Sequence, residues 1–385
     1  MSSTTAIPAG TTEIAPNGGI RFPVASRPQV RQSAQSTVSN LNGAVSFAPI
    51  QLPATGWVRK ISIFVTASYA CASAGAVVAG DAPWNILSGI TLTDATGQPI
   101  TQPISGYGLY LLNKYSPSEY GTRPLFVNNP HMGPEYAYSA TATAGTATYR
   151  LDLELEQDYS TGYGCVPNLD SNASLQLKID TAPASAAFSG TTPSASTVSI
   201  VVEQHYWAPV GGTMGGVPVQ TAPPGAGDFL EVRYENQAVN AASENTMAFT
   251  TRGGLIKSII LVSRNAGVRT DFAAGTNVGL VYDNVPIDEG YRVESFRDRM
   301  RRDFGYLGAD LTTSYAPLSA GVLPGLDRGV LVWNFDQRVV ERDAWLSTRV
   351  GTLLQSKFTP GAGATQAEVY TSLMQVRDAE AFYGA

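Results

Sequence analysis

The sequence predicts an all-β protein built from two tandem β-sandwiches, and three observations support this prediction. Short stretches of alternating apolar and polar residues recur along the chain, and such alternation places one face of a strand in a core and the other in solvent. Glycine (38) and proline (24) are abundant, which favours many turns. The length of 385 residues exceeds one ordinary core and suggests two domains.

The clearest strands lie between residues 151 and 207. Leu151–Glu156 and Leu175–Asp180 alternate strictly, and Val198–Trp207 follows a loop rich in serine, threonine and alanine. Because no helical pattern separates them, these three strands indicate antiparallel β structure. Pro209 and Gly211 follow directly, so we expect the first domain to end near this point.

The first domain begins with further strands and one short helix. We expect strands at Val45–Ile50, Gly56–Ala67 and Asp81–Asp94. Apolar residues at three-to-four spacing predict a helix over Ile104–Tyr115. A stretch rich in proline and glycine (116–146) then leads to the strands described above.

The second half of the chain repeats this order of elements. Strands are predicted at Gly253–Ser263, Leu280–Asn284, Gly329–Phe335 and Glu368–Val376. The first of them begins 197 residues after its counterpart (253 minus 56), and Leu331 lies 180 residues after Leu151. The halves share almost no sequence identity, so the repeated order is what indicates duplication. Each half is long enough for one sandwich of about eight strands.

Two segments of the second half are less regular. Pro286–Phe304 is predicted to be a helix, since acidic residues open it and Arg299, Arg301 and Arg302 lie in its last turn, where they complement the helix dipole. Ala344–Lys357 fits a helix and a strand equally well.

The composition limits the kinds of partner. Charged residues make up 15% of the chain and the formal net charge is −6, which argues against a nucleic-acid-binding protein. A surface poor in charge suits burial in subunit contacts. The low content of charged residues is equally explained by an amino-acid composition that is general in the source genome.

Residues 1–40 are predicted to form a polar arm with no sustained hydrophobic period, which either is ordered by another part of the assembly or stays mobile. Arg21, Arg27 and Arg31 against Glu13 give the arm a net charge of +2, opposite in sign to the rest. The arm is either a frayed terminus or a segment that laces subunits together or faces a negatively charged interior. It lacks the pattern of a secretion signal, and no apolar run approaches the roughly 20 residues that span a bilayer, so we expect a soluble protein made in the cytoplasm.

No constellation in the sequence predicts catalysis. The two histidines, His131 and His205, are far apart and are expected to be structural rather than metal ligands. Cys71 and Cys165 are expected to be buried free thiols. We therefore predict no catalytic, cofactor or metal residues, and no enzyme.

Glu154 and Glu156 share one face of a strand, and we interpret them as solvent-facing residues rather than as a glycosidase pair.

Two clusters have both a structural and a functional interpretation. Arg297–Arg302 could bind phosphate, but Asp298 and Asp303 as neutralising partners and an apolar stripe favour a helix tail or a subunit contact. The stripe consists of Phe296, Met300 and Phe304. A group of tyrosines, expected to be exposed, suits either carbohydrate stacking or an interface; its members are Tyr107, Tyr110, Tyr115 and Tyr120.

Three stretches carry a resemblance to a known family. Pro83–Asp94 and Ile104–Asn113 resemble a strand, an Asp-containing turn and a Ser-Gly-aromatic helix of that family's first barrel, and Tyr206–Gly211 is similar to the junction where that barrel ends. The family is the double jelly-roll major capsid proteins of tailless, membrane-containing double-stranded DNA bacteriophages, the tectivirus-like group, whose lineage includes the adenovirus hexon. The family's arm can be helical and rich in glutamine, whereas residues 1–40 show no helical period.

The resemblance implies two tandem eight-stranded jelly-roll β-sandwiches with short helices in loops. It implies an arm (1–40), a first jelly roll (41–210), a linker (211–227) and a second jelly roll (228–385). Homotrimers with a pseudo-hexagonal outline would tile an icosahedral virion shell and contact neighbouring trimers, penton proteins and minor capsid proteins. Arg21, Arg27 and Arg31 would face a membrane or the genome. The alternative is a two-domain carbohydrate-binding sandwich of a fibre or adhesin type.

Overall fold

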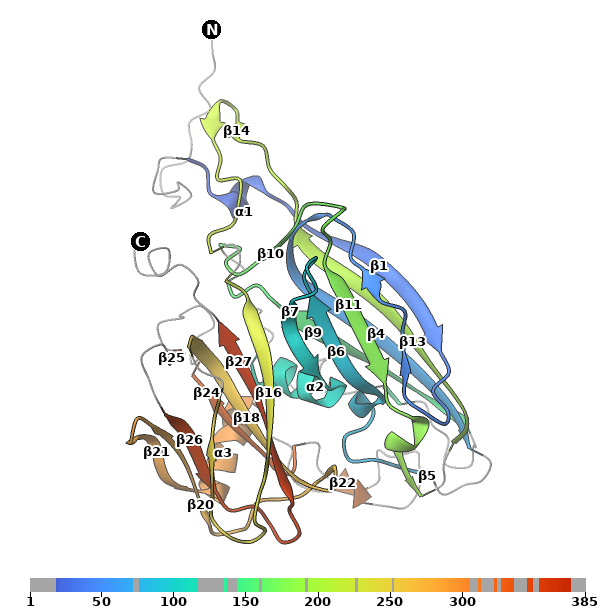
Figure 1. The fold of residues 1–385 in the computed structure, drawn as a ribbon, viewed down its shortest axis with the longest axis vertical. Helices are drawn as coiled ribbons and strands as arrows, with labels where there is room; N and C mark the ends of the chain where they lie inside the picture. Colours follow the sequence, from blue (N-terminus) through green and yellow to red (C-terminus); the bar gives the residue numbers. More distant parts are fainter. Residues whose placement is uncertain are drawn as a thin grey trace.

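The computed structural model contains two β-barrels, each a sandwich of two antiparallel sheets (Figure 1). It describes residues 19–71, 76–116, 135–136, 144–158, 161–190, 193–225, 228–250, 253–304, 311–312, 322–323, 327–335, 345–348 and 353–374.

The first barrel has two sheets. One runs in the order β1 (Pro28–Val38), β13 (Pro193–Trp207), β4 (Gly56–Cys71), β9 (Ala144–Glu154) and β8 (Glu135–Tyr136), with β10 (Val166–Asn168) also paired to β4. The other runs in the order β2 (Val45–Ser46), β11 (Gln176–Thr181), β6 (Leu87–Thr93) and β7 (Pro99–Ile104), with β3 (Ile50–Gln51) also paired to β11.

The second barrel repeats this arrangement. Its first sheet runs in the order β16 (Leu230–Ala238), β27 (Gln366–Met374), β18 (Leu255–Asn265) and β19 (Val268–Arg269), with β24 (Val330–Asn334) and β25 (Leu346–Ser347) also paired to β18. Its second sheet runs in the order β17 (Asn245–Ala248), β26 (Leu354–Phe358), β20 (Asn277–Tyr282) and β21 (Val285–Arg292).

Smaller elements complete the described chain. The paired short strands are β5 (Ala76–Val78) with β12 (Phe188–Gly190), β14 (Thr213–Met214) with β15 (Val217–Pro218), and β22 (Leu311–Thr312) with β23 (Val322–Leu323). The helices are α1 (Phe22–Ala25), α2 (Gly106–Tyr115) and α3 (Val293–Phe304), with short 3₁₀ turns at Trp84–Ile86 and Ala184–Ala186.

The two barrels are topological copies. The sheet order β1-β13-β4-β9 matches β16-β27-β18-β24, and β2-β11-β6-β7 matches β17-β26-β20-β21. Each set is eight strands in two four-stranded sheets, which is the jelly-roll arrangement. The prediction of two tandem jelly rolls is confirmed, and so is the correspondence of β9 with β24 and of β13 with β27.

The core of the first barrel follows from alternation along β4. Ile61, Ile63 and Val65 point inward and are fully buried, while Thr66 on the opposite face is exposed. They meet inward residues of the other sheet, such as Ile90 and Leu177. Each buried aliphatic side chain stabilises the fold by roughly 1.5–3 kcal/mol relative to an exposed one.

Helix α2 lies between the barrels (Figure 1). Ser105 caps it, because its Oγ accepts a hydrogen bond from the Gly108 amide at 3.1 Å. All ten residues of the helix are buried, so the predicted helix is confirmed but the expectation of exposed tyrosines is wrong for Tyr107, Tyr110 and Tyr115. Both barrels cover the helix, so it has no solvent face. Tyr120 lies outside the described residues.

The predicted helix over Pro286–Phe304 is wrong in its first part. Residues 285–292 form β21, and the helix begins only at Val293. Asp283 and Asn284 both adopt positive φ (46° and 65°), which makes a tight turn that returns the chain antiparallel to β20. Gly290 also has a positive φ of 68°, a conformation that a right-handed helix does not contain.

The structure also shows the secondary structure of residues 344–357 and of the predicted N-terminal arm, where these are described. The described parts of Ala344–Lys357 are strands, β25 and β26, rather than helix. Residues 28–38 of the predicted arm form β1, which pairs with β13 from Pro28↔Trp207 to Val38↔Val198 and is thus ordered by the first barrel. None of the eleven side chains of β1 is fully buried, so its sequence shows no hydrophobic period. Residues 1–18 lie outside the described chain.

Replacing Gly108 by alanine is expected to lower stability. Alanine favours a helix over glycine by about 1 kcal/mol. However, a Cβ at position 108 would lie 2.3 Å from the buried Tyr370 ring of the second barrel, and overpacking costs roughly 1–3 kcal/mol or more. Chemical denaturation measures the change. Gly211→Ala is the control, since its Cβ would meet nothing within 4 Å. A Gly108→Ala protein more stable than the parent would contradict the packing.

Candidate functional site

Helix α2 and the second barrel are joined by buried charges contributed by both barrels. Arg264 on β18 contacts Asp81 of the first barrel (Nη1–Oδ2 2.5 Å) and Glu368 on β27 (Nε–Oε2 2.5 Å). Arg269 on β19 also pairs with Asp81. Both guanidinium groups lie over the ring of Tyr107, at 5.6 and 5.0 Å from its centroid. Strands β18 and β19 of the second barrel are thereby held against Asp81 and helix α2 of the first barrel.

A second set of contacts lies at the end of α2. Lys114 pairs with Asp327, and neither side chain is exposed. Lys257 on β18 donates to the Ser116 carbonyl (3.1 Å), and Asn334 on β24 donates to the Tyr115 carbonyl (2.7 Å). Buried ion pairs add little net stability, but they penalise any arrangement that separates the partners. These contacts therefore fix one relative orientation of the barrels.

Sequence reasoning missed these residues. A usable signal exists, because Lys257 and Arg264 lie on either side of the apolar run Ile259–Val262, and Lys114 lies in a mostly apolar helix. Charged residues are almost never fully buried unless paired. The signal shows that partners are needed, but the partners lie far away in sequence.

Glu156 was interpreted as solvent-facing, and that interpretation is wrong. The strand β9 ends at Glu154, so the alternation stops there and Glu156 turns under the end of the first barrel. Its carboxylate accepts from Arg59 Nε (2.5 Å) and Trp207 Nε1 (2.7 Å), and Cys165 Sγ lies 3.6 Å away. Burial raises the pKa of Glu156, and the neighbouring Arg59 opposes that rise.

The same end of the first barrel holds the start of the described chain. Phe22 in α1 packs edge-on against Trp57 and Trp207, with ring centroids 6.3 and 6.2 Å apart. Ile20 forms a bridge with Val219 in the linker. The N-terminal segment and the linker therefore meet at one end of the barrel, where α1 and β14 lie together (Figure 1).

Of the histidines and cysteines considered as candidates, His205 and Cys165 are described, and their neighbours fit a structural role. His205 Nε2 lies 3.1 Å from Ser62 Oγ, and burial together with Lys60 lowers the pKa of His205 to about 4, so its imidazole is neutral at pH 7. Cys165 is a buried free thiol whose pKa is raised by burial. His131 and the side chain of Cys71 lie outside the described part. Within the described residues, no group of three or more His, Cys, Asp or Glu could hold a metal ion.

Three arginines of α3 have carboxylate partners. Arg297 pairs with Asp271, Arg299 with Asp288 (3.2 Å), and Arg302 with Asp303 (3.0 Å). On the opposite side of the helix, the predicted apolar stripe is confirmed for Phe296 and Met300, which are buried. The side chain of Phe304 is not among those described. The helix-tail interpretation thus fits the geometry better than a phosphate site does.

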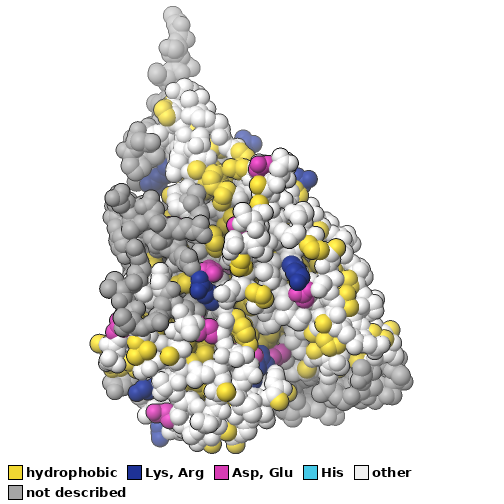
Figure 2. Space-filling model, viewed as in Figure 1, with side chains coloured by type: hydrophobic (Ala, Val, Ile, Leu, Met, Phe, Trp, Pro, Cys, Tyr) yellow, Lys and Arg dark blue, Asp and Glu magenta, His cyan; other side chains and the backbone are white. Residues whose placement is uncertain are grey.

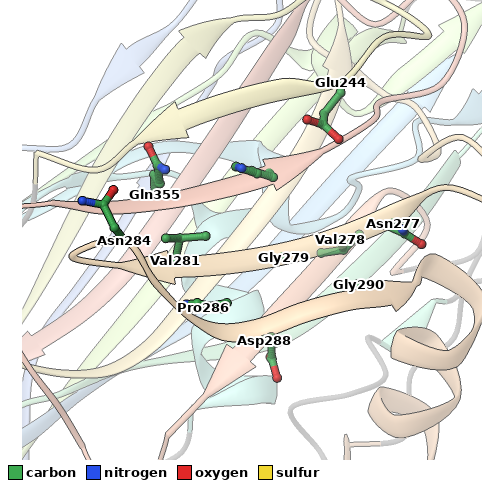
Figure 3. Close-up of a pocket in the computed structure, with 11 residues that line it drawn as sticks. Glu244, Asn277, Val278, Gly279, Val281, Asn284, Pro286, Asp288, Gly290 and Gln355 are labelled. Atoms are coloured by element: carbon green, nitrogen blue, oxygen red, sulfur yellow. The ribbon is translucent and has the colours of Figure 1, made fainter.

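One hollow opens on the outer face of the sheet that contains β20, β21 and β26 (Figure 3). Its volume is about 420 Å³, and its polar lining includes Glu244, Asn277, Asp288 and Lys357. It is open to solvent and has no aromatic lining residue, so it offers no stacking platform for a sugar.

The outer faces of the two main sheets differ in exposure. In the second barrel, β18 is buried at every position from Leu255 to Arg264 because the first barrel covers its outer face. In the first barrel, the matching face is open: Thr66 is exposed, and Val201, Glu203 and His205 are half-buried. The visible surface carries few charged side chains (Figure 2). Such a surface suits burial against another protein.

Arg21, Arg27 and Arg31 are all exposed. None of the helices in the described part of the chain is long and apolar enough to cross a membrane.

Comparison with known proteins shows likeness at the level of structure. No family model matches the chain, and no curated protein matches it in sequence. The chain is similar to the STIV MCP, with 14% identity, a TM-score of 0.59, and coverage of 90% of this chain and 96% of that chain. A chain of the Sulfolobus Turreted Icosahedral Virus structure gives 16% identity, a TM-score of 0.58 and 90% coverage of both chains.

A chain of the PBCV-1 virus capsid is also similar, with 10% identity, a TM-score of 0.52, and coverage of 91% of this chain and 93% of that chain. At such identities the likeness establishes the fold alone. Together with the strand order, these matches confirm the resemblance of the fold to double jelly-roll capsid proteins.

Replacing Lys114 by methionine is expected to destabilise the protein by roughly 3–5 kcal/mol, because the substitution leaves the buried Asp327 carboxylate without its cation. Urea denaturation measures the loss. Lys178→Met is the control: Lys178 is 54% exposed and lies 3.8 Å from Asp180, so about 0–1 kcal/mol is expected. Equal effects of the two substitutions would contradict the role of the buried pair.

Acidification is expected to weaken the fold partly through His205. Its folded pKa of about 4 lies below the ordinary value of 6.5, so the unfolded chain binds the proton first. The contribution is fully present above pH 6.5 and is lost as the pH falls towards 4. Free energies of unfolding across this range should fall less steeply for His205→Gln than for the parent. Identical slopes would contradict the assignment.

Proposed function

We propose that this protein is the major structural protein of an icosahedral virus shell and that it self-assembles as pseudo-hexagonal homotrimers. The observation that carries the proposal is the presence of two topologically equivalent jelly rolls in one chain, in a fold shared with viral capsid proteins over about 90% of its length. Three copies supply six barrels, and six similar barrels in a ring give a hexagonal outline that tiles a flat facet.

The physical character of the barrels supports this role. The strands of each barrel pair within their own sheets, so neighbouring copies must meet mainly through side chains on the flanks. Charged residues make up only 15% of the chain, and the face drawn in Figure 2 carries few of them, which reduces the cost of burying such a surface. Many weak contacts repeated over a shell add up to strong assembly.

The proposal also includes the partners of each trimer in the virion. Neighbouring trimers, penton proteins and minor capsid proteins would surround each trimer in the virion, after synthesis in the host cytoplasm. Arg21, Arg27 and Arg31 are exposed and suit contact with an anionic surface, either an internal membrane or the genome.

The alternative, a carbohydrate-binding sandwich of a fibre or adhesin type, has less support. Tyr107, Tyr110 and Tyr115 would have formed its stacking platform, but all three are buried between the barrels.

Light scattering of the purified protein tests the proposal. The expected mass is about three times the 40.7 kDa of one chain, with hexagonal outlines in negative-stain images. A protein that stays monomeric at every concentration and binds glycans would overturn it in favour of the alternative.

A further inference from the structure

One lysine and one aspartate meet where the two barrels join, at a place that solvent does not reach. Lys114, in the last turn of α2, is in direct contact with the carboxylate of Asp327, and both side chains are 0% exposed. The two residues are 213 positions apart in sequence. Lys114 belongs to the first barrel and Asp327 to the second, so a covalent bond between them would join the barrels directly.

The backbone holds both residues in place. Asn334 on β24 donates a hydrogen bond to the Tyr115 carbonyl at 2.7 Å and so fixes the end of α2. Asp327 opens the turn that leads into β24, and its carbonyl accepts a hydrogen bond from the Val330 amide at 3.1 Å. The amine and the carboxylate therefore meet through elements that are tied to each other, and not through mobile loops.

The surroundings of the Lys114 amine are poor in oxygen acceptors. In the part of the chain that the structure describes, Lys114 Nζ contacts the Asp327 carboxylate and lies 5.2 Å from the centroid of the Tyr115 ring. An ammonium group has three N–H donors, and these two contacts give it one partner that carries oxygen. Moving one proton from Lys114 to Asp327 removes both charges from the dry site and leaves a neutral amine beside a carboxylic acid.

We propose that Lys114 and Asp327 condense to form an isopeptide bond, which links the two barrels of one chain covalently. The inference concerns a single chain and does not depend on the assembly of copies.

The reaction needs only the two side chains. After the proton transfer, the lone pair of Lys114 Nζ attacks Cγ of Asp327 and a C–N bond forms. One proton moves from the nitrogen to a carboxyl oxygen, the bond between Cγ and that oxygen breaks, and the oxygen leaves as water. The products are one secondary amide and one water molecule, and nothing is oxidised or reduced.

Rigidity and burial favour the bond over the separate groups. Groups that are held in reacting positions behave as if their concentration were about 10⁵–10⁸ M, which favours condensation. Exclusion of water from the site slows the reverse reaction, hydrolysis. The amide also carries no charge, so the desolvation cost of two buried ions disappears.

Two other lysine–aspartate pairs in the described residues lack these conditions. Lys60 lies 3.9 Å from Asp152, whose carboxylate already accepts from Arg150 at 2.5 Å. Lys178 lies 3.8 Å from Asp180, and their side chains are 54% and 33% exposed. Neither pair combines direct contact with full exclusion of solvent, so neither is expected to react.

Mass spectrometry of the intact purified protein tests the inference. The linked chain should be lighter than the unlinked chain by the mass of one water molecule, and the loss should persist after complete unfolding. Trypsin should not cut after Lys114, and the tryptic peptide 303–328, which contains Asp327, should be recovered joined to the peptide that contains Lys114. A protein of full mass that releases peptide 303–328 in free form would overturn the inference.

Lys114→Arg is the matched control. A guanidinium keeps a positive charge beside Asp327, but it stays protonated and cannot supply the lone pair that the reaction needs. This variant should therefore have its full mass and release peptide 303–328 in free form. If it is also lighter by one water, the loss arises from another reaction, such as ring closure of an aspartate with its own backbone, and the inference fails.

The digest of the parent protein also decides the question without any variant. Joined peptides should be found for Lys114 and Asp327 and not for Lys178 and Asp180. A bond at the exposed pair would contradict the role given to burial. The mass of the single chain in denaturant is independent of trimer formation, so the result leaves the proposed function to its own light-scattering test.

Discussion

The burial of helix α2 between the barrels is the constraint on which the rest of the structure depends. A helix with no solvent face brings Lys114 and the ring of Tyr107 into the interior, and the second barrel supplies their charged partners. An arrangement that kept these charges buried but moved their partners apart would leave each charge unpaired, which costs several kcal/mol for each pair. These contacts therefore favour one relative orientation of the two jelly rolls, and a fixed orientation is what the tiling that we propose requires.

The two topologically equivalent barrels have different surroundings. The sheet face around β18 is closed by α2, whereas the face around β4 is open, although the strand orders are the same. The sequence differs accordingly, because β18 contains the unbroken apolar run Ile259–Val262, while β4 alternates. A strand covered on both faces has no reason to alternate. The pattern of each copy thus reports what covers it within the chain.

Sequence patterns predicted the elements whose side chains are buried at regular intervals. They did not predict elements that are held in place by hydrogen bonds or by partners distant in sequence. The strands β4 and β9 and helix α2 carry clear periods, so they were predicted. The strand β1 was not, because its order comes from hydrogen bonds to β13 rather than from buried side chains. The burial of Glu156 could not be predicted either, since its partners Arg59 and Trp207 come from strands distant in sequence.

The edge strand β1 of the first barrel has a composition that suits both contact with water and burial against another protein. Between Arg27 and Val38 the exposed edge strand carries glutamine, serine, threonine and arginine around only a few apolar residues. Such a mixture is hydrated well enough to keep a single chain in solution, because isolated exposed apolar side chains are normal and only continuous patches drive aggregation. It also gives up little solvation when a complementary surface arrives. In the shell that we propose, each contact between copies is weak, and the shell becomes stable because every copy makes several such contacts at once.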